Sequence, residues 1–104
     1  MYQPDNWIIL KVAAEDESYY KVLAGWSGGY LDGDSWRMNS GITEIEVSNN
    51  YYDFISDSGS IYRCAIKGEI VRMNIAEVLT ELLEQFPDTV SVVNVDDILS
   101  EFTK

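Results

Sequence analysis

The chain has 104 residues, of which 46% are hydrophobic, enough apolar side chain for one core in one domain over residues 1–104. Its 18 Asp and Glu residues against 7 Lys and Arg give a formal net charge of −11. This charge excludes a protein that binds nucleic acid directly or adsorbs to an anionic membrane, because both need a basic face.

The chain shows no pattern for a membrane span or for export. No apolar run approaches the roughly 20 residues that cross a bilayer, and the first residues lack the basic and apolar regions of a signal peptide. The one cysteine, Cys64, cannot form a disulfide within the chain, which favours a reducing compartment. We therefore expect a cytoplasmic protein without membrane contact.

The first part of the chain predicts strands. Residues 7–13 suit a strand with Ile8, Leu10 and Val12 on one face, and residues 19–24 suit a second because they are rich in aromatic and β-branched side chains. The polar stretch 14–18 joins them as a turn. Residues 25–41 are rich in glycine and predict a long loop, which leaves room for a short strand around residues 36–38.

Three further strands are predicted at hairpin spacing. Residues 43–47, 51–55 and 61–66 alternate, and Asn49-Asn50 suits a two-residue hairpin turn. The first of these strands is expected to bury Thr43, Ile45 and Val47. Together with the earlier strands they predict an antiparallel β-meander.

The hydrophobic period changes to a helical one at Asn74. Asn74 and Glu77 fit the N-cap and N3 positions of a helix that Pro87 ends. Its apolar stripe consists of Ile75, Val78, Leu79, Leu82, Leu83 and Phe86. Residues 90–95 suit a short strand, and Asp96 suits the cap of a last short helix. The fold class is therefore α+β: an antiparallel β-meander sheet packed by one amphipathic helix, with a short C-terminal strand and helix.

Enzyme signatures are sparse. The chain has no histidine, so it lacks catalytic dyads and triads that use imidazole, and imidazole metal ligands. Cys64 lies at an inward strand position, where a thiol is inert. The Asp32-Gly33-Asp34 motif fails the EF-hand pattern, which leaves a simple turn or an irregular cation site. We predict a non-enzymatic protein without a cofactor or a metal.

Two features are candidates for binding a partner. The first is a set of aromatic side chains among glycines, Trp26, Tyr30 and Trp36, because Trp and Tyr are enriched at interfaces. The alternative role for these rings is to cover the core.

The second feature is the charge of residues 73–103, which contain acids but no Lys or Arg. The acids are Glu77, Glu81, Glu84, Asp88, Asp96, Asp97 and Glu101. Helical spacing puts the first three on one face, where like charges repel. Such a face either keeps the protein soluble or binds a basic partner. Mimicry of DNA would need the Asp96–Glu101 cluster, or Glu44 and Glu46, to lie beside the helix, because the helix alone has too few charges.

Three runs carry a resemblance to known proteins: Tyr-Tyr-Lys-Val-Leu-Ala-Gly-Trp-Ser-Gly-Gly-Tyr (19–30), Asp-Ser-Trp-Arg-Met-Asn-Ser-Gly-Ile (34–42) and Ser-Gly-Ser-Ile-Tyr-Arg-Cys (58–64). Over residues 19–64 the chain resembles small accessory proteins of bacteriophages and prophages. The resemblance carries no assigned activity and transfers no functional residue. It implies an accessory phage protein, and small acidic proteins of this kind often resemble inhibitors of host defence, including anti-CRISPR and anti-restriction proteins.

These observations give one hypothesis and one alternative. The hypothesis is an acidic inhibitor in the host cytosol that binds a basic surface on a nucleic-acid-handling complex, through the acids of residues 77–101 and the aromatic side chains of residues 26–36. The alternative is a structural or assembly module whose aromatic side chains bind another phage protein, while the charge maintains solubility.

Overall fold

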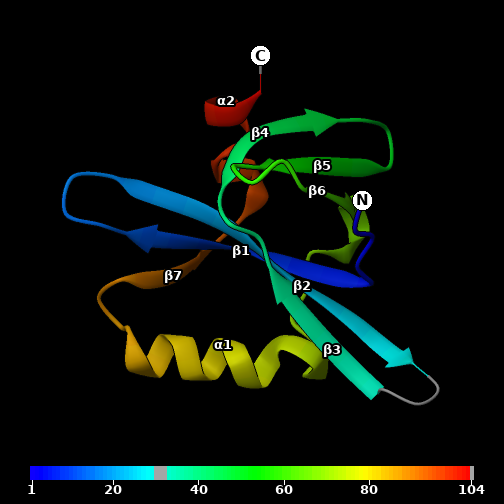
Figure 1. Cartoon of the computed structure of the whole chain (residues 1–104), viewed down its shortest axis with the longest axis horizontal. Helices are drawn as coiled ribbons and strands as arrows, with labels where there is room; N and C mark the ends of the chain where they lie inside the picture. Colours follow the sequence, from blue (N-terminus) through cyan, green and yellow to red (C-terminus); the bar gives the residue numbers. More distant parts are fainter. Residues whose placement is uncertain (30–32, 104) are drawn as a thin grey trace.

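The structure is a computed structural model that describes residues 1–29 and 33–103. The α+β class is confirmed, with antiparallel strands and one main helix (Figure 1). In chain order the elements are β1 (Asn6–Ala13), β2 (Ser18–Gly29), β3 (Gly33–Met38), β4 (Ile42–Val47), β5 (Tyr51–Ser56), β6 (Ile61–Ala65), the 3-10 turn η1 (Ile66–Gly68), α1 (Met73–Gln85), β7 (Val90–Val93), the 3-10 turn η2 (Val95–Asp97) and α2 (Leu99–Phe102). No helix in these described ranges is long and apolar enough to cross a membrane.

The strands form two sheets, where the sequence predicted one meander. One sheet has the order β3-β2-β1-β7 and the other β4-β5-β6. Asn39, which is buried, separates them: its side-chain oxygen accepts a hydrogen bond from the Val22 N–H at 2.8 Å, and its amide nitrogen donates to Ser56 Oγ at 3.0 Å. The side chain therefore ends the pairing of β3 and ties the first sheet to the second.

The four-stranded sheet is the middle of three layers, with α1 on one face and the three-stranded sheet on the other (Figure 1). Strand β1 explains this arrangement, because its side chains are apolar in both directions. Trp7 and Ile9 point into the core between the sheets, whereas Ile8 and Leu10 point toward α1. A strand with two apolar faces needs a covering layer on each face.

The helix-side core is smaller than the core between the sheets. Ile75 and Leu79 of α1 are buried against the sheet, as the helical stripe predicted. Phe86 was predicted to belong to the buried stripe of the helix. It is instead the C-cap residue that follows α1, and 47% of its surface is exposed. The helix stops before Pro87, in agreement with the sequence.

Asn74 is not the N-cap of α1. The helix begins one residue earlier, at Met73, and Asn74 is buried inside its first turn. The Asn74 side chain pairs with that of Asn6 on β1, which donates to Asn74 Oδ1 at 3.0 Å and accepts from Asn74 Nδ2 at 2.6 Å. Gly25 makes room for this pair, because a Cβ at that position would lie 2.5 Å from Asn74 Oδ1.

The predicted loop over residues 25–41 is wrong for residues 25–29 and 33–35, which are strand, whereas the short strand predicted around residues 36–38 is confirmed as the end of β3. Strand β2 continues to Gly29 and pairs with β3, which begins at Gly33. A register shift between Trp26 and Gly29 accommodates the glycines. Gly25 weakens the alternating sequence pattern because it has no side chain. The residue nevertheless belongs to β2, and it is glycine because the Asn74 side chain occupies the space that a Cβ would need.

The buried residues of β4 differ from those that the sequence predicted. Ile45 is buried as predicted, but Thr43 and Val47 are exposed. A register shift between Ile42 and Glu44 explains part of this difference, because it makes Ile42 rather than Thr43 the buried residue.

Candidate functional site

A groove lies between α1 and β3. A helix is about 10 Å wide, whereas four strands span roughly 15 Å from first to last, so one helix leaves part of the sheet uncovered. The uncovered part forms a hollow of about 350 Å³ near the start of the helix. Its lining residues are Asp34, Trp36, Met73, Asn74, Glu77, Val78 and Glu81. We call this hollow the β3–α1 groove.

A second, apolar hollow of about 260 Å³ lies farther along the same side of α1. Its lining includes Met38 of β3 together with Leu82 and Phe86. The start of α1 lies near Trp36 of β3, and its end lies near Met38 and residues of β1, β2 and β7, so α1 crosses the sheet obliquely (Figure 1). The pair of hollows is acidic at one end and apolar at the other.

The strand period places Trp36 in the groove. Met38 packs in the helix-side core, so Trp36, two residues earlier, faces the same side. Its cross-strand neighbour is Gly25, which offers no side chain to cover the ring. As a result 49% of Trp36 is exposed, although a tryptophan in a small domain is usually well buried.

Three carboxylates accompany this ring. Glu77 and Glu81 are exposed on α1, one turn apart, and Asp34 is held in place at the hairpin because it accepts a hydrogen bond from the Gly28 N–H at 3.1 Å. Across residues 1–29 and 33–103 the one ion pair joins Arg63 to Asp53, at 2.9 Å. The groove acids therefore have no cationic partner within the described part of the chain.

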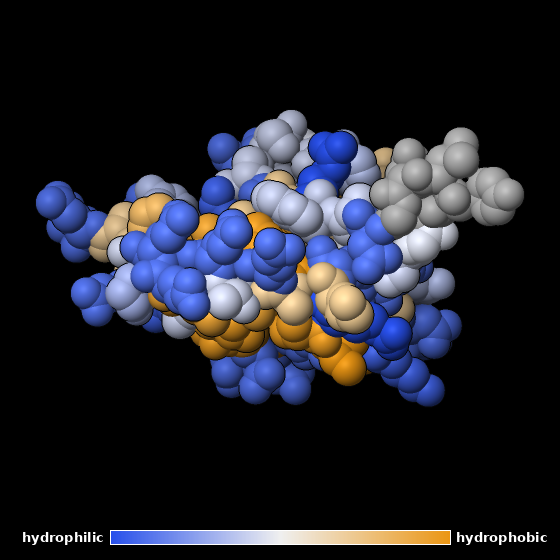
Figure 2. All heavy atoms as spheres, turned by 90° about the horizontal axis from the view of Figure 1, so that it is seen from below, coloured by the Kyte–Doolittle hydropathy of each residue, from blue (hydrophilic) through white to orange (hydrophobic). Residues whose placement is uncertain are grey.

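The structure brings together three of the residues predicted to bind a partner: Trp36, Glu77 and Glu81. Glu84 is exposed on the same helix but does not line the groove. Asp88 is exposed in the turn after α1. Figure 2 shows this side of the molecule, where hydrophilic side chains run along α1 with hydrophobic surface on both sides.

Other predicted residues lie outside the β3–α1 groove, although Trp26 and Trp36 both line a separate hollow of about 390 Å³ that Arg37 also lines. Trp26 faces away from α1, stacks edge-on against Tyr2 at 6.4 Å between ring centroids and donates its indole N–H to the Gln3 carbonyl oxygen at 3.0 Å. Its ring covers part of the core, which was the alternative role. Tyr30 lies outside the residues that the structure describes.

Asp96 and Asp97 are on the opposite face of the four-stranded sheet from α1. Their turn, η2, is anchored by Val95 and Ile98 in the core between the sheets. There they lie near Glu69, whose pKa is raised by burial and by the two aspartates, although the Val95 N–H donates to its carboxylate at 2.8 Å. The acids of residues 73–103 therefore form two separate groups.

This separation removes the arrangement that DNA mimicry needed. Asp96 and Asp97 do not extend the row of acids on α1. Glu44 and Glu46 belong to β4 of the three-stranded sheet, on the far side of the four-stranded sheet. The groove is a local acidic and aromatic site rather than a long array of charge.

Cys64 is buried as predicted. None of its surface is exposed, and burial raises the pKa of its thiol far above the ordinary value, so the reactive thiolate does not form near neutral pH. No cluster of three potential metal-ligating side chains occurs among the described residues. Asp32 lies outside those residues, and Asp34 serves the hairpin through its bond to Gly28.

Met73 and Asp34 are members of the groove that the sequence patterns did not identify. Met73 is the first residue of α1 and is 88% exposed, the largest exposed fraction among the large hydrophobic side chains described. The sequence could have indicated this exposure, because Met73 is an apolar residue outside the apolar stripe that begins at Ile75. Asp34 was considered only as a cation ligand.

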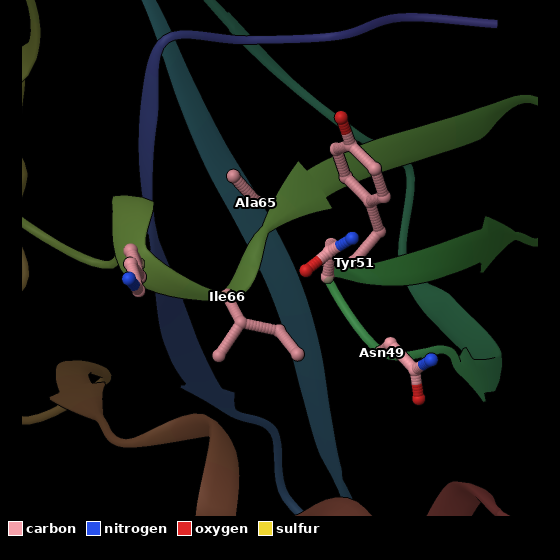
Figure 3. A pocket seen from close by; sticks show the side chains of 6 residues that line it. Asn49, Tyr51, Ala65 and Ile66 are labelled. Atoms are coloured by element: carbon pink, nitrogen blue, oxygen red, sulfur yellow. The ribbon is translucent and has the colours of Figure 1, made fainter.

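A further hollow, of about 280 Å³, lies where the β4–β5 turn meets the end of β6. Figure 3 shows that the side chains of Tyr51 and Ile66 point apart rather than toward a common centre. Lys67 is the one charged residue in its lining. This hollow does not gather groups that act together on a ligand.

Comparison of the chain with models of protein families, with curated proteins and with solved structures finds no match.

Proposed function

We propose that this protein is a non-enzymatic binding module that captures a basic segment of a partner protein in the β3–α1 groove. The observation that carries the proposal is the juxtaposition of a half-exposed Trp36 and an exposed Met73 with Glu77 and Glu81. Lysine and arginine side chains combine an apolar stem with a cationic head. Such side chains fit a hollow that offers an aromatic ring beside carboxylates.

The class of partner follows from the same chemistry. Protein surfaces that bind nucleic acid are strongly basic, since they neutralise phosphate groups. We therefore propose that the partner belongs to a host nucleic-acid-handling complex and that binding covers its basic surface. In this role the protein acts as an inhibitor of the anti-CRISPR or anti-restriction type. The net charge of −11 supports fast encounter with such a partner.

The test compares two double variants of equal charge. Glu77→Lys with Glu81→Lys reverses the acids in the groove, whereas Glu84→Lys with Glu101→Lys reverses two exposed acids outside it. Each protein, with the wild type, is used to capture partners from a nuclease-treated bacterial lysate at low and high salt. Mass spectrometry identifies the captured proteins, and circular dichroism checks the fold of each variant.

We expect the groove variant to lose the basic, nucleic-acid-binding proteins that the wild type captures, while the matched variant retains them. Capture should also weaken as salt rises, because charge attraction is screened. The captured complex should then bind its nucleic acid less tightly when the wild-type protein is added. Equal capture by the two variants at low salt would contradict the proposal.

A second candidate function is a structural or assembly module. The exposed fractions of Trp36 and Met73 favour it, because exposed apolar side chains that line one hollow can bind without charge. On this alternative, capture is insensitive to salt and to charge reversal, but it is lost in Trp36→Ala. The salt series therefore separates the two functions.

A further inference from the structure

Strand β3 is an open edge of the four-stranded sheet beside the groove. Within residues 1–29 and 33–103, β3 pairs with β2 on one side and with no strand on the other. An open edge presents unpaired backbone N–H and C=O groups, which other proteins satisfy by pairing with an extended segment. The hairpin register determines which residues of β3 present these groups.

The pairing of Asn39 with Val22 sets this pattern. The Asn39 N–H donates to the Val22 carbonyl oxygen at 3.1 Å, and the register continues through Leu23 opposite Met38 and Gly25 opposite Trp36. Bonded and non-bonded pairs alternate in an antiparallel ladder. Trp36 and Met38 therefore direct their N–H and C=O groups outward, whereas Ser35 and Arg37 direct theirs to β2.

The side chains beside this edge match an extended basic segment. In a strand, alternate residues lie about 6.8 Å apart on one face, and residues one helical turn apart, such as Glu77 and Glu81, are about 6 Å apart along the axis. Because β3 lies beside the first turns of α1, a strand added to β3 would pass close to the part of the helix that carries Glu77 and Glu81. Two alternating lysines or arginines on it would meet the two glutamates in turn.

We propose that the basic segment of the partner binds as an additional β-strand on β3. Its backbone pairs with the outward groups of Trp36 and Met38, and its alternate basic side chains enter the groove beside Glu77 and Glu81. This inference rests on the proposed function and adds the mode of recognition. The backbone bonds supply affinity, and the acidic groove selects for cationic side chains.

Charge favours this occupant over a second copy of the chain. Another copy placed on β3 would bring its own Asp34, Glu77 and Glu81 close to the same acids, and each copy carries a net charge of −11. Like charges placed side by side oppose association. A basic extended segment instead neutralises the groove.

The test uses a synthetic peptide as the probe, acetyl-(Thr-Lys)4-amide, with the full-length protein. Two further peptides carry N-methyl groups, one on every lysine amide and the other on every threonine amide. In an added strand only one of these sets faces β3, so we expect one methylated peptide to bind at least about tenfold more weakly than the other. Affinities are measured by isothermal titration calorimetry at low salt.

Amide hydrogen exchange locates the bound strand. With saturating peptide, exchange of the Trp36 and Met38 N–H groups should slow by about tenfold or more, while exchange of Ser35 and Arg37 stays unchanged. Val92 is the internal control: the bond from the Ala13 N–H to the Thr89 oxygen puts the Val92 N–H on the other open edge, β7. Its exchange should not change.

The outcomes separate this inference from the proposed function. Equal weakening by the two methylated peptides, protection of Val92 instead of Trp36 and Met38, or no binding of the unmethylated peptide would each overturn strand addition. Concentration-dependent dimerisation that protects Trp36 and Met38 without peptide would replace the basic segment with a second copy. The proposed function is judged independently, by capture with the Glu77→Lys and Glu81→Lys variant.

Discussion

The two faces of the four-stranded sheet are covered to different extents. One face carries a second sheet and the η2–α2 segment, which bury Trp7, Phe54 and Tyr62 almost completely. The other face carries only α1, and Trp36 and Met73 stay exposed beside it. A second sheet can cover a sheet of similar width, whereas a single helix cannot. The closed face therefore serves stability, and the half-covered face has groups available to bind a partner.

The largest expected difference between the faces is in the free energy of unfolding that is lost when a tryptophan is replaced by alanine. Trp7→Ala should lower the free energy of unfolding by about 3–5 kcal/mol, because Trp7 is fully buried and its indole N–H donates to the Ala65 oxygen at 2.8 Å. Trp36→Ala should cost less than about 1 kcal/mol. Urea denaturation followed by far-ultraviolet circular dichroism measures both. Equal costs would show that the groove side is packed as tightly as the closed face.

An intermediate loss of stability is expected where the start of α1 meets β1 and β2. Gly25→Ala places a Cβ against Asn74, and Asn74→Ala removes a partner of the buried Asn6, so each should destabilise by about 1–3 kcal/mol. The double variant should cost less than the sum, because alanine at position 74 leaves space for the new methyl group. Thermal denaturation of the four proteins gives this coupling. Strict additivity would mean that the two positions do not touch.

The smallest change in stability is expected for a substitution of Glu69, on the closed face. Burial raises the pKa of this carboxyl above its ordinary value, so the folded protein binds the proton more tightly than the unfolded chain. Stability therefore decreases as pH rises from the ordinary pKa through the folded pKa. Glu69→Gln should raise the melting temperature slightly near pH 7 and leave it unchanged at pH 3. A gain of equal size at pH 3 would exclude charge as the cause.

The sequence predicted most of the elements because their patterns are local. Alternation identified the strands around Ile9, Phe54 and Tyr62, and the three- and four-residue spacing identified α1 with Ile75 and Leu79. The division into two sheets was not predictable in this way, because alternation marks a strand but not its neighbour. That division depends on the buried side chain of Asn39, which reads as an ordinary loop residue.

The candidate site was predicted in part for the same reason. Helical spacing alone places Glu77 and Glu81 together, so the sequence contains that information. Their meeting with Trp36 depends on a long-range packing of α1 on β3 that Gly25 and Asn74 make possible. The location of Asp96 depends on the path of the chain after β7, across to the other face of the sheet.

The position of β7 has a consequence for how the protein folds. Strand β1 pairs with β2 next to it in the sequence and also with β7, in a register that joins Ile9 to Val93. During synthesis the β1–β2–β3 hairpins can form early, but closing the long loop to β7 has a large entropic cost and must wait until β7 itself has left the ribosome. Because α1 immediately precedes β7, the groove is among the last parts of the molecule to be assembled. The newly made protein thus acquires its proposed binding site only when its sheet is complete.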